Sequence, residues 1–234
     1  MPKALYSLLL GITFLIVRPL AAQPDTLTYF PNDRVRGGAP TFYDTMGYRL
    51  HYPPSGFSNH RVGTSVVAIT ITPQGGMRPV EFITSLGYGF DKIIRHVITT
   101  NRDIWLADSY VQNDIVLLVP FTFLFANSVY YRADKPPPTI LPEVRIIAGR
   151  GNSIRDDLTL TTRANHHYLE KRYRKAKRYL DELIRRNPYN VNLYRMRSTA
   201  RFHTKDREGA CADLKRITTL LHKPAPDEAA AWCP

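Results

Sequence analysis

The sequence lacks the motifs on which most enzymatic chemistry depends. It contains no phosphate-binding loop of the GxxxxGKS/T type, no GxSxG nucleophile turn, no CxxC pair and no cysteines at metal-binding spacing. His166 and Glu170 could share a metal ion if both lie on one helix, but we favour two solvated polar side chains. We therefore expect that the protein is not an enzyme and that it holds no cofactor and no metal.

The N-terminus lacks an apolar run long enough to cross a membrane as a helix. Leu8–Val17 contains about ten residues, whereas a bilayer-spanning helix needs about 20. Lys3 precedes this run, and small residues suitable for cleavage follow it at Ala21-Ala22-Gln23. We predict a secretory signal peptide over residues 1–22. The alternative is that residues 7–20 form an uncleaved membrane anchor.

Cysteine is scarce, and only Cys211 and Cys233 occur in the chain. An exported protein can join such a pair in a disulfide, provided that a helix runs out from the first residue and a tail folds back. Two unpaired thiols are the alternative, and the spacing does not decide between them.

Acidic residues are scarce in one part of the chain only. Residues 163–223 contain 17 Lys and Arg but 6 Asp and Glu, so they carry +11 of the net charge of +12. Such asymmetry indicates two domains of different character. A basic face with interleaved tyrosines could bind nucleic acid or anionic lipid, but export argues against nucleic acid. We expect either a solvated face or attraction to an acidic partner or to acidic lipopolysaccharide.

Alternating residues predict a β-hairpin over residues 60–82. Val67, Ile69 and Ile71 alternate with smaller or polar residues, as on a strand with two different faces. The turn is expected at residues 73–76, which include two glycines, and a second strand follows. Pro79 cannot donate a backbone hydrogen bond, so the second strand is expected at an edge.

A helix and a third strand follow the hairpin. The apolar residues between Phe90 and Ile98 recur at helical spacing and form one stripe. Residues 113–125 then alternate as in a strand, and the second face is also largely apolar, so the strand is either covered on both sides or binds something. The predicted fold class is α+β, a small antiparallel sheet with one packed helix. Pro and Gly clusters predict a linker over residues 127–157.

The C-terminal part contains an internal repeat of 34 residues. Residues 161–184 align with residues 193–217, placing Ala176 over Ala210 and Leu180 over Leu214. This period resembles that of the tetratricopeptide family over residues 158–222 and implies an all-α helical-repeat domain. Two repeats are fewer than such arrays need alone. We therefore expect them to lean on the tail, residues 223–234, on the strand domain or on a partner.

Residues 36–126 resemble the C-terminal domain of TonB energy transducers of the Bacteroidetes type. The similarity is carried, in order, by the segments RGGAPTFYDTMGYRLHYP, GTSVVAITITPQGG, MRPVEFITSLGYGFDKIIRHVITTNRDIW and IVLLVPFTF. The resemblance implies a periplasmic α+β domain that contacts an outer-membrane TonB-dependent receptor or another periplasmic protein. Residues 23–35 would be a short linker. Because the apolar run and this spacer are short, we expect a binding module without a motor; a membrane-anchored transducer is the alternative.

The resemblance also implies a binding edge. In the family, an extended receptor segment adds to the sheet beside the last strand, where unpaired backbone groups accept a peptide. A free edge could also pair with a second copy and form a homodimer. Carried over to this chain, the peptide-binding edge would consist of Ile115, Val116, Leu117, Leu118, Val119 and Phe121. The alternative is that these residues belong to the core.

Overall fold

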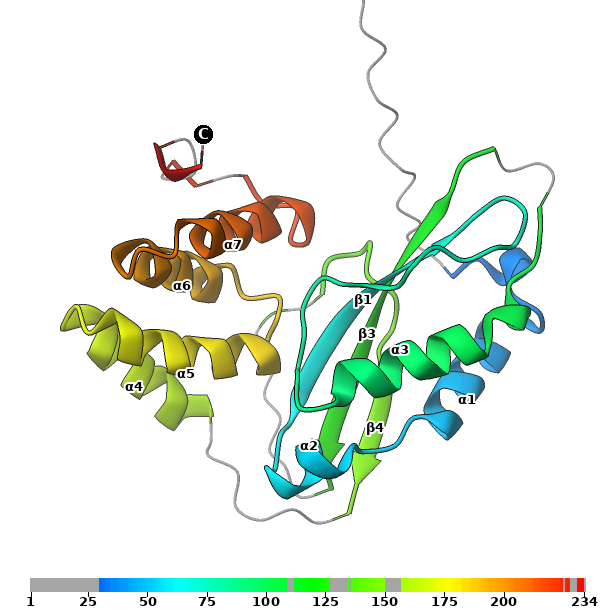
Figure 1. Ribbon diagram of the computed structural model, residues 1–234, viewed down its shortest axis with the longest axis horizontal. Helices are drawn as coiled ribbons and strands as arrows, with labels where there is room; N and C mark the ends of the chain where they lie inside the picture. The colour runs from blue at the N-terminus through cyan, green and yellow to red at the C-terminus, as the bar shows by residue number, and fades with distance from the viewer. Residues whose placement is uncertain are drawn as a thin grey trace, which may run out of the picture.

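A four-stranded sheet separates two groups of helices (Figure 1). The computed structural model describes residues 30–108, 112–126, 134, 136–149, 157–224, 226–227 and 231–233. The first half contains the 3-10 helices η1 (Asn32–Arg34) and η2 (Arg102–Ile104), the helices α1 (Gly38–Arg49), α2 (Pro54–Ser58) and α3 (Phe90–Thr100), and the strands β1 (Gly63–Ile71), β2 (Glu81–Phe82), β3 (Ile115–Phe125) and β4 (Val144–Ala148). The second half contains α4 (Asp157–Leu169), α5 (Tyr173–Arg186), α6 (Val191–His203) and α7 (Arg207–Thr219).

The sheet has the strand order β2-β1-β3-β4. The predicted hairpin is confirmed, because β1 pairs with β2 in antiparallel fashion. β1 also pairs antiparallel with β3 along its whole length, from Gly63 opposite Phe123 to Ile71 opposite Ile115. β4 runs parallel to β3. The sheet is therefore mixed, and the prediction of a purely antiparallel sheet is wrong for its last strand.

β4 overturns two predictions. It lies within residues 127–157, which were predicted to be a linker, and it pairs Val144–Ala148 with Phe121–Phe125 of β3. The backbone N–H of Leu141 also donates to the carbonyl oxygen of Leu118, at 2.9 Å. β3 is thus interior from Leu118 to Phe125, and the prediction that it forms the edge is wrong for that part. The six predicted edge residues, Ile115, Val116, Leu117, Leu118, Val119 and Phe121, all pair with β1, but on the other side the described residues pair with β3 only from Leu118 onward.

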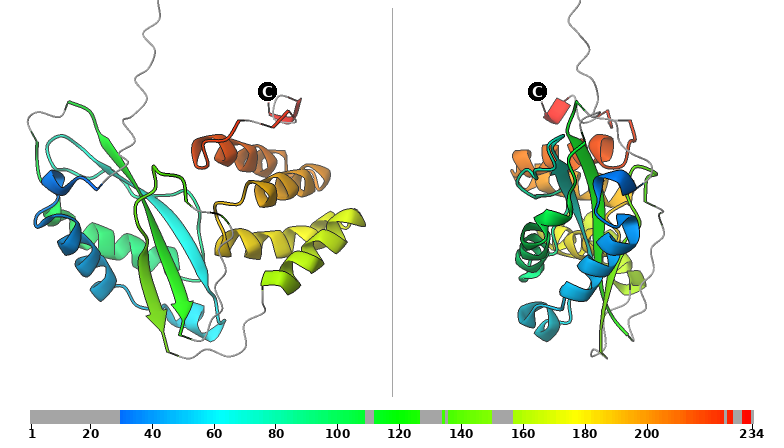
Figure 2. Two further views of the ribbon diagram at one scale, coloured as in Figure 1. Left: turned by 180° about the vertical axis from the view of Figure 1, so that it is seen from behind. Right: turned by 90° about the vertical axis from the view of Figure 1, so that its right-hand side faces the viewer.

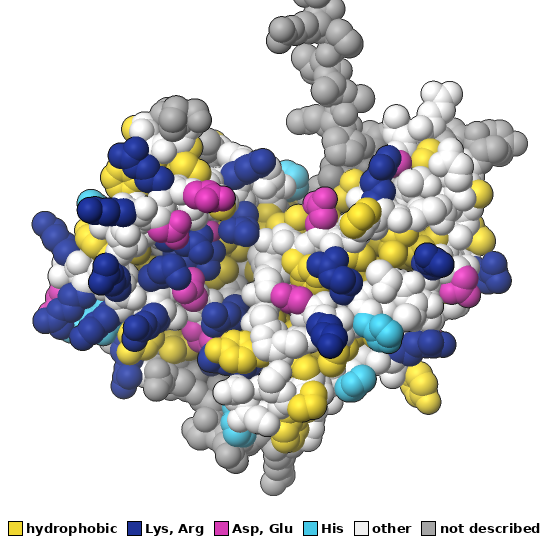
Figure 3. Space-filling model, in the orientation of Figure 1, with side chains coloured by type: hydrophobic (Ala, Val, Ile, Leu, Met, Phe, Trp, Pro, Cys, Tyr) yellow, Lys and Arg dark blue, Asp and Glu magenta, His cyan; other side chains and the backbone are white. Residues whose placement is uncertain are grey.

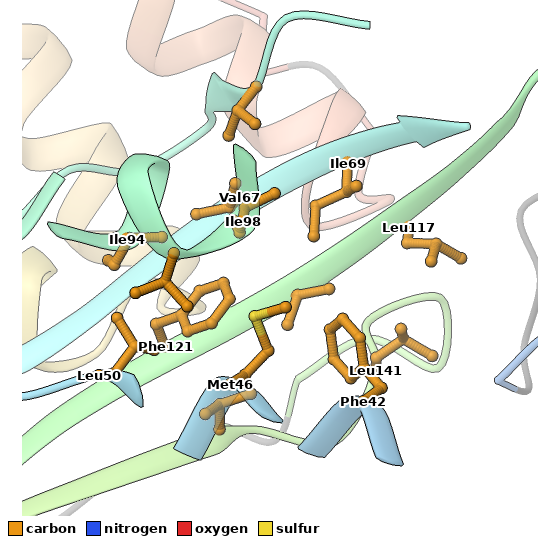
Figure 4. Close-up of a cluster of buried hydrophobic side chains, with 14 of the residues drawn as sticks. Phe42, Met46, Leu50, Val67, Ile69, Ile94, Ile98, Leu117, Phe121 and Leu141 are labelled. Atoms are coloured by element: carbon orange, nitrogen blue, oxygen red, sulfur yellow. The ribbon is translucent and has the colours of Figure 1, made fainter. Parts of the chain in front are cut away.

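α1 and α3 cover one face of the sheet. Phe42 and Met46 of α1, with Ile94 and Ile98 of α3, pack on the odd-numbered residues of β1 and β3, such as Phe121 (Figure 4). The predicted apolar stripe of α3 is buried here. Burial of such side chains away from water is the main force that holds helix and sheet together.

The second helical group covers the opposite face (Figure 2). Even-numbered sheet residues, such as Val66 and Leu118, share a buried cluster with Ile184 of α5, Tyr194 of α6 and Ile217 of α7. β3 is therefore covered on both sides, one of the two outcomes expected for it. The expectation that the helical pairs lean on the strand domain is also confirmed.

α4 to α7 form two helical pairs with the predicted period. α4 and α6 begin 34 residues apart, at Asp157 and Val191, and α5 and α7 begin 34 residues apart, at Tyr173 and Arg207. Asn190 caps α6 by accepting from the N–H of Leu193, and the Asp206 side chain caps α7 in the same way. Ala176 and Ala210 are fully buried, so neighbouring helices approach closely there.

The C-terminal tail is fixed to the second helical pair. Cys211 and Cys233 form a disulfide with their Cα atoms 5.5 Å apart, so the pairing alternative is confirmed. The Trp232 ring stacks on Phe202, with ring centroids 4.3 Å apart.

No helix in the described ranges combines the length and the apolar composition that crossing a membrane requires. The predicted signal peptide, residues 1–22, and the alternative anchor, residues 7–20, lie outside the described residues.

Because the sheet and the helical pairs share one buried cluster, we predict that Ile217→Ala destabilises both halves together. The cavity should lower the free energy of unfolding by about 2–5 kcal/mol. Urea unfolding measures the stability of each half through tryptophan fluorescence. Trp105 reports on the sheet half and Trp232 on the helical half, and each is followed in a variant whose other tryptophan is replaced by Phe. Ile147→Ala, at a position 59% exposed, is the control and should change stability by at most about 0.5 kcal/mol. A shift at Trp232 without a shift at Trp105 would contradict the prediction.

Candidate functional site

The candidate site is a basic cleft between the helical pairs and the sheet half. α5 shapes it, because its apolar residues face the core while Lys177, Asp181 and Arg185, spaced four residues apart, form one polar stripe. Two cavities open along this stripe and share Asp181 and Arg185 in their linings. We name them the outer cavity, of about 580 Å³, and the inner cavity, of about 290 Å³. Lys and Arg side chains gather on the helical half in Figure 3.

The outer cavity lies between α4, α5 and the segment before β1. Its charged lining consists of the cations Arg61, Lys175, Arg178 and Arg185 and the carboxylates of Asp181 and Glu182. Leu160 and Tyr179 add apolar surface.

Glu182 ties the helical half to the sheet half at this cavity. Its carboxylate accepts from Arg61 at 2.8 Å, from Arg185 at 2.8 Å and from Arg186 at 3.2 Å. The Arg61 guanidinium also lies over the Tyr88 ring, 4.4 Å from its centroid, and donates to the Tyr88 hydroxyl. Arg61 is therefore held from both sides of the cleft.

The inner cavity is bordered by α5, α6, α7 and the loop at Thr84-Ser85. Its lining contains five cations, Lys177, Arg185, Arg197, Arg201 and Arg216, and one carboxylate, that of Asp181. A second carboxylate, Asp213 of α7, lies next to it and is fully buried.

Asp213 organises the cations of α6 and α7. Arg197 binds it through two parallel hydrogen bonds, from Nε to Oδ2 at 2.9 Å and from Nη2 to Oδ1 at 2.6 Å. Arg201 lies 2.9 Å from Oδ2, and Arg216 lies 3.3 Å from Oδ1. The single negative charge of Asp213 thus neutralises only part of the positive charge of the three guanidinium groups.

Asp181 connects α5 to this network. It accepts from Arg197 Nη1 at 3.0 Å and from Lys177 Nζ at 2.9 Å. Burial alone would raise the pKa of Asp181, but the hydrogen bond from Lys177 and the charge of Arg197 outweigh it and hold the pKa below its usual value. Arg216 extends the network to the sheet half, because its Nε donates to the carbonyl of Ile83 at 3.0 Å.

The cations of the cleft outnumber its carboxylates even after these ion pairs are counted. Across both cavities eight Lys and Arg side chains face Asp181 and Glu182, with Asp213 behind them. A concave surface with an excess of one sign of charge concentrates ions of the opposite sign. The cleft can therefore attract and hold an anion.

The residues predicted as a peptide-binding edge are not part of this cleft. They lie in β3, and from Leu118 onward the sheet edge on that side is formed by β4 and the segment before it. The carbonyl of Ala148 accepts from the N–H of Ala126 at 3.1 Å and therefore points toward β3. Because backbone groups alternate in direction along a strand, those of Arg145 and Ile147 point away from β3.

His166 and Glu170 form an ion pair on the surface of α4, with Nε2 and Oε2 3.2 Å apart. With His167 they form a group whose ligand atoms lie within 4.8 Å of one another. Arg172 also binds Glu170, at 2.9 Å. Burial, and then the charges of His166, Lys175 and Arg172, lower the pKa of His167.

Sequence reasoning detected the basic character of the helical half but not the cleft. The arginines at 197 and 201 are spaced so as to share a helix face, which is a weak signal. Nothing in the sequence indicates that Asp213, Asp181 and the Thr84-Ser85 loop meet them.

Comparison with known proteins leaves the family open: no family model matches the chain, and neither the curated proteins nor the solved structures contain a match.

We predict that Asp181→Asn destabilises the protein at neutral pH but not in acid. The substitution leaves Lys177 and Arg197 without a charged acceptor, which should lower the free energy of unfolding by about 1–3 kcal/mol. Because the folded-state pKa of Asp181 is lowered, its contribution is present above the unfolded pKa and is lost as the pH falls below about 4.

Urea unfolding at neutral and acidic pH measures this difference. Asp44→Asn, at an exposed position of α1, is the matched control and should change little at any pH. A difference between the native protein and Asp181→Asn that stays equally large in acid would refute the prediction.

Proposed function

We propose that this chain is a binding module that works outside the cytoplasm and holds an acidic segment of a protein partner in its basic cleft. The single observation that carries the proposal is the excess of cations in the outer cavity, which opens between the two halves of the molecule. Charge complementarity of this kind steers association and selects the partner.

The size and lining of the outer cavity support a protein segment as the ligand. A volume of about 580 Å³ accommodates several side chains, and Leu160 and Tyr179 offer apolar contact beside the cations. Lys175 and Arg178 are exposed at the surface and free to reorient toward a ligand, whereas Arg61 and Arg185 are fixed by Glu182. Such a mixture of fixed and adaptable groups is typical of protein interfaces.

The ion pairs also favour binding over catalysis. Each carboxylate of the cleft accepts from at least two cations. For Asp181, the hydrogen bond from Lys177 and the charge of Arg197 hold the pKa below its usual value despite burial, and such a carboxylate is a poor general base near neutral pH. We infer that the protein is not an enzyme.

The compartment and the class of partner belong to the same proposal. The Cys211–Cys233 disulfide favours an oxidising compartment, in agreement with the predicted signal peptide and periplasmic location. The chain order of two strands, a helix and a third strand supports a TonB-like sheet half, and outer-membrane receptors are then natural partners. If residues 7–20 were an uncleaved anchor, the same module would be held at the inner membrane.

Charge reversal at the outer cavity should test the proposal. We predict that the double variant Lys175→Glu/Arg178→Glu binds a fluorescently labelled oligoglutamate peptide about tenfold more weakly than the native protein, because two exposed cations of the cavity are reversed. Fluorescence anisotropy at two salt concentrations measures the affinity. An oligoglutamine peptide of equal length should bind neither protein.

The matched control is Lys205→Glu/Lys215→Glu, which changes the net charge equally at exposed positions outside both cavities. It should reduce affinity only slightly. An equal loss of affinity in the two double variants would indicate general charge attraction rather than a specific site, and would contradict the proposal.

Strand addition at β4 is a second candidate function. β4 ends the strand order on its side of the sheet, the backbone groups of Arg145 and Ile147 point outward, and the Ile147 side chain is 59% exposed. Such an edge can accept an extended peptide or a second copy of the chain.

For this edge, we predict that Ile147→Pro abolishes capture of outer-membrane receptors from a membrane extract while Ile147→Thr retains it. Proline removes the outward N–H without breaking a bond to β3, whereas threonine keeps both the N–H and the strand preference. Circular dichroism should show both variants folded. Equal capture of receptors by the two variants would exclude this edge as their docking site. Failure of both variants and of the native protein to capture any receptor would exclude it too.

A further inference from the structure

We infer that the inner cavity is a binding site for a small oxyanion of the phosphate or sulfate type. The inference goes beyond the proposed function, because it concerns a different cavity and does not need a protein partner. It follows from the hydrogen-bonding capacity of Asp213 and from the charge that this residue leaves uncompensated.

Asp213 has little acceptor capacity left. A carboxylate offers about four lone-pair positions, and Asp213 accepts three hydrogen bonds, from Arg197 and Arg216 on Oδ1 and from Arg197 on Oδ2. Nη1 of Arg201 also lies 2.9 Å from Oδ2 as an ion pair. The remaining N–H groups of Arg201 and Arg216 must therefore find another acceptor.

Those N–H groups are incompletely satisfied within the described part of the chain. Nε of Arg201 is buried without a hydrogen-bond partner there, and its nearest carboxylate oxygen, on Asp206, lies 3.5 Å away. Arg201 Nη1 also donates to the Gly209 carbonyl, and Arg216 uses Nε for the Ile83 carbonyl. Leaving a buried donor unpaired costs about 1–3 kcal/mol, which a bound acceptor would offset.

The charges require an anion rather than a neutral acceptor. The cavity lining carries five positive charges, on Lys177, Arg185, Arg197, Arg201 and Arg216. The facing negative charges are those of Asp181, Asp213 and Asp206, and Glu182 is shared by Arg185 with Arg61 and Arg186. Positive charge therefore remains in excess beside a partly enclosed cavity, which favours an anion.

The geometry and size favour a tetrahedral oxyanion. Guanidinium groups present pairs of N–H donors that match phosphate and sulfate oxygens. The inner cavity, at about 290 Å³, has half the volume of the outer one and is closed on the sheet side by the Thr84-Ser85 loop. The ligand would touch both halves of the molecule and so strengthen their docking.

Titration with inorganic phosphate tests the inference, with inorganic sulfate in parallel and chloride at equal ionic strength as the reference. We expect saturable binding by isothermal titration calorimetry and a rise in melting temperature that chloride does not cause. Arg201→Gln and Arg216→Gln should each weaken phosphate binding about tenfold, whereas Arg195→Gln, at an exposed position of α6, should not change it. Absence of saturable phosphate binding, or equal affinity in all three variants, would overturn the inference.

Two further measurements keep the outcome clear. Should Arg201→Gln fail to fold, Lys177→Gln, at a partly exposed position, takes its place, and the phosphate-dependent melting of the native protein remains an independent measurement.

Vesicles of phosphatidylcholine with and without phosphatidic acid distinguish binding of a free oxyanion from binding of a lipid headgroup. Binding to anionic vesicles without any binding of inorganic phosphate would mean surface attraction and would refute the cavity site. Lys175→Glu/Arg178→Glu should leave phosphate binding within about twofold, so this inference and the proposed function can fail separately.

Discussion

Both faces of the central sheet are apolar, and the rest of the structure depends on covering them. Val67 and Phe121 represent the face that packs on α1 and α3, and Val66 and Leu118 represent the face that packs on α5, α6 and α7. The dependence is mutual, because two helical pairs alone expose apolar surface that a longer array would bury against further repeats. Here the sheet covers that apolar surface of the helices. Docking of the two halves therefore brings the charged groups of the cleft together.

Within that cleft, three carboxylates set the charge balance. Asp213, Asp181 and Glu182 each bind two or more cations, and together they leave the cleft positively charged. Buried ion pairs of this kind contribute little net stability, since desolvation offsets much of the attraction, but losing one partner is costly. Their main effect is to hold arginines at defined positions in low-dielectric surroundings, where attraction for an anion is strong. This is why we propose binding rather than proton transfer for the cleft.

The parallel strand β4 changes how strand addition could operate. It occupies part of the side of β3 that the TonB resemblance implied to be open, from Phe121 to Phe125, and Ile140 also bridges to Leu118 there. Pro120 fits this arrangement, because its missing N–H lies on the even-numbered side of β3, where β4 and the segment before it approach. Among the described residues, β4 ends the sheet on this side, so its side chains, Arg145 and Ile147 among them, would select a strand added there.

The sequence by itself determined the local elements. The hairpin around Val67, the α3 stripe and the 34-residue helical period follow from spacings of two, about 3.6 and 34 residues, which are properties of neighbouring residues. Only the tertiary structure decided that Val144–Ala148 joins β3, that Cys211 pairs with Cys233, and that Arg197, Arg201 and Arg216 converge on Asp213. A five-residue strand between Pro and Gly clusters has too little periodicity to stand out. Contacts between distant segments depend on which buried surfaces fit one another, and this information is spread over the whole chain.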